Sequence, residues 1–192
     1  MADIKNDISG ESYKKFIKYM CSNSKILCFT ITTYDYLYHD NENEEQYKEY
    51  IKNIEKIMKK LNPYVLKTIN TPLNFLLLGI EYEREEWENE EYLYDIYLFE
   101  INKEVEAILL EETKNLSSWR KPYLPEDLMF IKDDFIKFSI TSHENYASVY
   151  CDSREEFKKV KEMGIEFYKE YNKQYEEKNK ESSKKIIQLL LK

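Results

Sequence analysis

Glycine is scarce in this chain, with only three among 192 residues. Glycine lets a backbone approach a bound phosphate closely or turn sharply beneath a nucleophile. The sequence also contains no GxGxxG, GxxxxGK[ST] or GxSxG motif, the patterns of dinucleotide-binding folds, P-loops and nucleophile elbows. Nucleotide-dependent enzymes and serine hydrolases are therefore poor candidates for this protein.

Cysteine is equally scarce, and the three cysteines, Cys21, Cys28 and Cys151, form no CxxC pair. An odd, widely spaced set favours small core residues over a disulfide framework or a zinc site. The start of the chain, MADIKNDISG, has neither the basic residues nor the apolar run of a signal peptide. The apolar stretch PLNFLLLGI is too short to span a bilayer. We therefore expect a reduced, cytoplasmic protein without membrane contact.

Basic charge is also in deficit, because the net charge is −8. The segment 154–192 holds eleven Lys/Arg and eight Asp/Glu, so residues 1–153 carry a balance of −11. An acidic body disfavours binding to nucleic acid or to anionic membranes. It is compatible with a basic protein partner, and equally with simple solubility.

Tyrosine, in contrast, is abundant, with eighteen copies. A tyrosine buries its ring while its hydroxyl stays wet, which suits half-buried and interface positions. AT-rich codon usage would produce the same excess, so the tyrosines alone do not establish a binding surface.

The periodicity of apolar residues predicts an α+β fold with a mainly antiparallel sheet backed by helices. We expect one domain over residues 1–152, followed by a long C-terminal helix over 153–192 that packs on it or extends from it. Strand is favoured over buried helix at 73–82, and a short helix capped by Asn102 is favoured over a hairpin. The other expected elements are helices at 11–21 and 43–61 and strands at 25–33, 92–101, 128–131, 135–141 and 145–150.

The strands at 128–131 and 135–141 are expected to form a hairpin around Asp133–Asp134. In the second of them, Ile136, Phe138 and Ile140 alternate with Lys137, Ser139 and Thr141, which is the period of a half-buried strand and places Lys137 on its polar side.

The C-terminal segment begins with Ser153 and Glu156, spaced as a capping box. The apolar positions that follow predict a single long helix. Its apolar stripe fades near Asn179 and Ser182, where we expect a break or a swing of the helix away from the body of the protein. The apolar end at 186–191 requires a partner surface, which the same chain or another protein would supply.

Residues 119–150 concentrate the residues with special chemistry. His143 and Glu144 are adjacent, so an imidazole base oriented by a carboxylate is conceivable. In a strand, however, the two side chains would point to opposite faces. No HExxH spacing is present, so a zinc helix is excluded. We favour a structural role for both residues and expect neither a metal nor a cofactor.

Two further features of this block have a structural and a functional interpretation. The step Pro125–Glu126–Asp127 offers paired carboxylates for acid–base work, but Pro followed by Asp is also the ordinary opening of a turn or a short helix. Trp119 is expected to fill the core rather than bind a ligand. For Trp87, which lies within a run of glutamates, core and interface are equally plausible.

The same block resembles a pattern found in small bacterial proteins: Trp, Pro, then Pro-Glu-Asp-Leu, an aromatic strand and a Ser-His-Glu step. The resemblance covers residues 98–150 and implies an immunity protein, a class that neutralises the toxins of rival or sibling bacteria. The matching positions are Trp119, Pro122, Pro125, Glu126, Asp127, Leu128, Phe130, Ser142, His143 and Glu144.

The leading hypothesis is therefore a non-enzymatic inhibitor that covers a basic toxin domain. One alternative is an enzyme that uses His143 with Glu144 or Asp127 as acid–base groups. Another is a phage or plasmid inhibitor of a host defence complex, acting through an acidic surface. The expected contact surface comprises the acidic segments 40–49 and 81–91, with Asp40, Glu42, Glu44, Glu45, Tyr82, Glu85, Glu86, Trp87 and Glu88.

Overall fold

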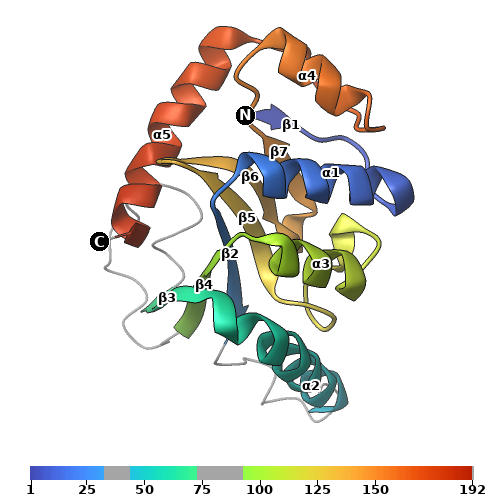
Figure 1. The fold of residues 1–192 in the computed structure, drawn as a ribbon, viewed down its shortest axis with the longest axis vertical. Helices are drawn as coiled ribbons and strands as arrows, with labels where there is room; N and C mark the ends of the chain where they lie inside the picture. The colour runs from blue at the N-terminus through green and yellow to red at the C-terminus, as the bar shows by residue number, and fades with distance from the viewer. Residues whose placement is uncertain (33–43, 73–92, 192) are drawn as a thin grey trace.

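A computed structural model of the chain describes residues 1–32, 44–72 and 93–191 (Figure 1). Within these ranges, seven strands form one sheet in the order β1-β7-β6-β5-β2-β4-β3. Every neighbouring pair is antiparallel. The strands are β1 (Ala2–Asp3), β2 (Ile26–Thr32), β3 (Val65–Pro72), β4 (Leu93–Glu100), β5 (Glu126–Lys132), β6 (Phe135–Thr141) and β7 (Tyr146–Val149).

Helices pack on both faces of this sheet, which confirms the predicted α+β class. Asn102 caps the third helix as expected, because its Oδ1 accepts a hydrogen bond from the Val105 amide at 2.9 Å. The competing hairpin at this position is wrong. The helices in the described ranges are α1 (Gly10–Asn23), α2 (Glu44–Leu61), α3 (Lys103–Glu112), α4 (Arg154–Lys161) and α5 (Lys173–Leu191).

The larger core lies between one face of the sheet and the helices α1, α2, α3 and α4. Its centre is aromatic: the rings of Phe16 in α1 and Phe138 in β6 meet edge to face, with centroids 5.0 Å apart. Phe29 in β2 lies 4.7 Å from Phe99 in β4, measured between ring centroids. These aromatic pairs bury large apolar areas and contribute about 0.5–1.5 kcal/mol each beyond burial.

The opposite face of the sheet carries α5 (Figure 1). Ile187 and Leu190 of this helix are buried against Cys28, Leu98 and Ile131 of the central strands. The apolar end of the chain therefore finds its partner surface within the same chain, and the sheet is covered on both faces.

The predicted long C-terminal helix is present as α5, but it does not run unbroken from residue 153, because α4 ends at Lys161 and α5 begins at Lys173. Gly164 adopts φ +90°, a conformation that L side chains rarely adopt and that commonly follows a helix end. The expected break at Asn179 and Ser182 is wrong, since α5 continues through both residues. The expected element at 73–82 lies outside the described residues.

Within the described ranges, no helix combines the length and the apolar character needed to cross a bilayer.

Docking of α5 is tested by truncating Ile187, which is 1% exposed. The variant Ile187→Ala should lower the free energy of unfolding by about 2–4 kcal/mol, because it leaves a cavity against the sheet. Leu191→Ala is the matched control, since Leu191 is 46% exposed, and it should change stability by less than about 0.5 kcal/mol. Urea unfolding measures both; equal, small effects would show that α5 does not pack on the sheet in solution.

Candidate functional site

Most of the predicted contact surface falls outside the described residues. Asp40, Glu42, Tyr82, Glu85, Glu86, Trp87 and Glu88 lie there, and their role stays a prediction. Glu44 and Glu45 begin α2, where the side chain of Glu45 is exposed.

Trp119 occupies the core, as predicted, and is fully buried. Its indole Nε1 donates a hydrogen bond to the hydroxyl of Tyr13 at 3.0 Å. That hydroxyl in turn donates to the carbonyl of Leu109 in α3 at 3.2 Å. Burial raises the pKa of Tyr13, which keeps its proton available for this bond. Trp119 thus anchors the turn after α3 to α1.

Asp127 has a structural role at the start of β5. It is buried and adopts φ +54°. Its amide donates to the Ser142 hydroxyl at 2.7 Å, and its Oδ1 accepts from the Ser142 amide at 2.9 Å. Thr30 in β2 donates to its Oδ2 at 3.4 Å. The expected turn or short helix at 125–127 is wrong, because Glu126 and Asp127 are strand residues. The Asp127 carboxylate instead accepts from a backbone N–H, that of Ser142.

The His143–Glu144 step lies in a 3-10 turn, Ser142–Glu144, that follows β6. Because β6 ends at Thr141, the strand argument that places the two side chains on opposite faces does not apply. Asn145 then adopts a left-handed conformation with φ +51° and closes the turn into β7. Glu144 is exposed, and the side chain of His143 lies outside the described part of the structure.

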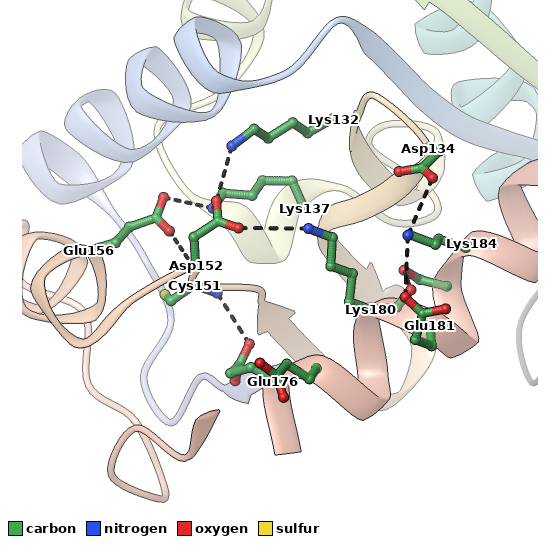
Figure 2. Close-up of polar contacts among 12 residues, drawn as sticks. Lys132, Asp134, Lys137, Cys151, Asp152, Glu156, Glu176, Lys180, Glu181 and Lys184 are labelled. Atoms are coloured by element: carbon green, nitrogen blue, oxygen red, sulfur yellow. Dashed lines mark hydrogen bonds and ion pairs between the residues drawn. The ribbon is translucent and has the colours of Figure 1, made fainter. Parts of the chain in front are cut away.

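A buried charge cluster at the end of the sheet is the main polar feature of the described structure (Figure 2). At its centre is Lys137, which is 0% exposed. Ile131 pairs with Ile136 and Phe130 pairs with Phe138, so Lys137 is the extra residue of a β-bulge in β6. The alternation of β6 predicted an outward Lys137. The prediction is wrong because the bulge redirects this side chain into the protein.

Glu156 in α4 is the principal partner of Lys137. Its Oε1 lies 2.7 Å from the Lys137 ammonium nitrogen and also accepts from the hydroxyl of Tyr19 in α1. The predicted capping box is half confirmed. The Ser153 hydroxyl accepts from the Glu156 amide, but the Glu156 carboxylate accepts from the Asp152 amide, at 2.5 Å, instead of the Ser153 amide. The contact with Lys137 explains why the carboxylate accepts from the Asp152 amide and not from the Ser153 amide, because Lys137 holds the carboxylate toward the sheet.

Asp152 extends the cluster toward the surface (Figure 2). Its carboxylate lies 3.0 Å from the Lys132 ammonium and 3.8 Å from that of Lys137. Lys180 of α5 approaches it at 3.9 Å, and the ammonium of Lys180 lies over the ring of Phe135 at 4.2 Å. The cluster therefore ties β6, α4 and α5 to one another.

Burial and hydrogen bonding act in opposite directions on the acidic members of this cluster. Burial of Glu156 acts to raise its pKa, but the hydrogen bonds from Lys137 and Tyr19 outweigh it, and the pKa is lowered. Glu176 in α5 is different, because burial is the larger effect and raises its pKa, although it accepts a hydrogen bond from the Cys151 amide at 3.2 Å. Glu156 is thus held ionised as the counter-ion of Lys137.

The cysteines are buried, which confirms their predicted place in the core. Burial raises the pKa of Cys21, Cys28 and Cys151 to about 12 in each case. A thiol needs to ionise to act as a nucleophile or a metal ligand, so none of the three suits either task near neutral pH. Over residues 1–32, 44–72 and 93–191, no group of three His, Cys, Asp or Glu side chains is placed to hold a metal ion.

Exposed tyrosines gather at the β1 end of the sheet. Tyr146 in β7 is 43% exposed, Tyr168 is 65% exposed, and Tyr175 in the first turn of α5 is 42% exposed. Asp3 in β1 joins them, because its carboxylate accepts from the Tyr146 hydroxyl and its carbonyl accepts from the Tyr168 amide at 3.0 Å. We call Asp3, Tyr146, Tyr168 and Tyr175 the tyrosine face.

The electrostatics of the tyrosine face are acidic around Tyr146. Its pKa is raised first by burial, then by the hydrogen bond to Asp3, and further by the nearby Tyr175 and Glu144. The hydroxyl therefore stays protonated and acts as a donor to Asp3. Rings beside carboxylates are suited to contact with cationic groups.

Comparisons with known proteins identify no relative: no family model, no curated protein and no solved structure matches this chain.

The lowered pKa of Glu156 predicts a loss of stability in acid. Unfolded glutamate titrates near pH 4.5, and folded Glu156 titrates below it, so the unfolded chain binds more protons in this window. Stability contributed by Glu156 is therefore present above pH 4.5 and lost as the pH falls through the folded value. Glu156→Gln should be less stable than the wild type at pH 7, and the difference should shrink by pH 3.

Urea unfolding at both pH values measures this change. Glu176, whose pKa is raised, changes the pH dependence of stability in the opposite direction. Because Glu176 is present in both proteins, the comparison isolates the effect of Glu156. Glu162→Gln, an exposed change just beyond α4, is the control and should keep the acid sensitivity of the wild type. A difference between wild type and Glu156→Gln that does not depend on pH would contradict the assignment.

Proposed function

We propose that this protein is a non-enzymatic inhibitor that binds another protein, and most concretely an immunity protein that neutralises a toxin. One observation carries the proposal: among the described residues, the buried charged groups that could perform chemistry are engaged by neighbours inside the fold. Glu156 and Asp152 surround Lys137, and Asp127 bonds with Ser142. These groups support the scaffold, and the protein's surface is left to carry the function.

Occlusion is the mechanism that fits this distribution of groups. A chain with a net charge of −8 attracts a basic partner over a distance set by ionic strength, which raises the rate of association. Tyrosine supplies rigid contact area at low cost in conformational entropy. The acidic segments 40–49 and 81–91, with Trp87 and Tyr82 among them, remain the proposed contact surface, supplemented by the tyrosine face.

The wild-type chain should rescue growth when it is co-expressed with the toxin encoded beside its gene, because a covered toxin surface cannot reach its target. The complex should survive gel filtration. Trp87→Ala should weaken it about tenfold or more if this ring is an interface hot spot. Tyr123→Ala is the matched control, since it removes an aromatic ring that is 54% exposed and lies outside the proposed surface.

Isothermal titration calorimetry measures the affinities of the three proteins. The absence of both rescue and a stable complex would contradict the proposed function. A stable complex that Trp87→Ala does not weaken would contradict the proposed contact residue and leave the function in place.

A further inference from the structure

We infer that the tyrosine face, Asp3 with Tyr146, Tyr168 and Tyr175, is a docking surface for an arginine-rich segment of a partner protein. The inference rests on the proposed function, because it names one surface and one partner chemistry for that activity. It concerns residues far from the acidic segments predicted from the sequence.

Strand alternation places Asp3 and Tyr146 on one face of the sheet. Ile4 pairs with Phe167, and both pack into the larger core. Asp3 lies between Ala2 and Ile4, which both pack into that core, and it therefore points to the opposite face, since successive side chains of a strand alternate. Tyr168 directly follows the bridge at Phe167 and lies beside Asp3, because its amide donates to the Asp3 carbonyl at 3.0 Å. Tyr146 joins Asp3 because the adjacent Ala147 is buried in that same core. This opposite face is the one that carries α5, whose first turn supplies Tyr175.

The outer edge of β1 is already occupied by the chain itself. The Lys5 amide donates to the Glu166 carbonyl at 2.8 Å, and the Tyr168 amide donates to the Asp3 carbonyl at 3.0 Å. A partner strand therefore cannot extend the sheet at this edge. Binding here has to use the side chains, which are rings and a carboxylate.

Rings beside a carboxylate match the chemistry of arginine. A guanidinium group stacks on aromatic faces and binds carboxylates through parallel hydrogen bonds. The chain already places one cation near this face, with the Lys169 ammonium 6.0 Å from the centre of the Tyr175 ring. Within the tyrosine face, Asp3 supplies a carboxylate whose hydrogen-bond donor is the neutral Tyr146 hydroxyl.

Two of the nearby lysines, Lys5 and Lys173, lie beside carboxylates of the same chain. Lys5 lies 3.5 Å from Glu166, and Lys173 lies 3.7 Å from Glu177. They therefore add little repulsion against an incoming cation. Nucleic acids and anionic lipids are poor occupants, because Asp3 sits within the face and Glu144 lies near Tyr146.

Deca-arginine and deca-lysine peptides are the probes for the test, titrated into the full chain at about 150 mM salt. The double variant Tyr168→Ala/Tyr175→Ala keeps the net charge, so the general attraction between chain and peptide is unchanged. It should weaken deca-arginine binding about tenfold, as expected for the loss of two ring–cation contacts. Tyr168→Phe/Tyr175→Phe keeps both rings and should bind within about twofold of the wild type.

Tyr123→Ala is the matched control and should also stay within about twofold. Deca-lysine should bind more weakly than deca-arginine, because an ammonium neither stacks on a ring nor forms parallel hydrogen bonds. Circular dichroism of each variant verifies its fold, and the Phe pair keeps the test decisive if the Ala pair unfolds, since weakened binding by a folded Phe pair would contradict the ring contact.

Four results would overturn the inference: no binding of deca-arginine, equal binding of both peptides, a folded Ala pair that binds like the wild type, or a folded Phe pair that binds more weakly than the wild type. None of these depends on the neighbouring toxin. If the chain rescues growth but fails this test, the proposed function stands and the tyrosine face is rejected as the docking surface. If the chain passes this test but does not rescue growth, the tyrosine face stands as a docking surface and the neighbouring toxin is rejected as its partner.

Discussion

The ion pair between Lys137 and Glu156 is the contact on which the packing of α1 and α4 against β6 depends. Removing an ammonium and a carboxylate from water costs several kcal/mol per ion. The structure offsets this cost with a 2.7 Å contact and with hydrogen bonds to Glu156 from the hydroxyl of Tyr19 and the amide of Asp152. Since these groups come from β6, α4, α1 and the β7–α4 connection, a single charge cluster fixes how the helices sit on the sheet.

In this arrangement, the residues that hold the fold together are different from the residues that are exposed for binding. Within residues 119–150, Trp119 and Asp127 hold neighbouring elements together, and neither presents its polar atoms to solvent. The exposed rings of Tyr146, Tyr168 and Tyr175 lie at the β1 end of the sheet, near Asp3. A rigid frame beneath exposed aromatic side chains is the geometry that a binding surface requires, because contacts held in place lose little entropy on association.

Strong local patterns in the sequence predicted the elements of the fold. The candidate site was harder to predict, because it depends on contacts between residues far apart in the chain. The apolar spacing over 43–61 and the hairpin around Asp133 are confirmed because each pattern is self-contained. The edge strand β3 mixes polar and apolar residues and gave no periodicity to follow. Lys137 was misplaced because alternation fails at a bulge. The tyrosine face joins Asp3 to Tyr168, and a single sequence has no pattern that links such distant positions.

The central claim is that the Lys137–Glu156 pair acts as one unit, and a double-mutant cycle measures this most directly. Lys137→Met should lower the free energy of unfolding at pH 7 by about 3–5 kcal/mol, because it leaves Glu156 without its buried counter-ion. When Glu156→Gln is added, the combined loss should be smaller than the sum of the two single losses, by at least about 1 kcal/mol. Losses that add within about 0.5 kcal/mol would contradict the claim.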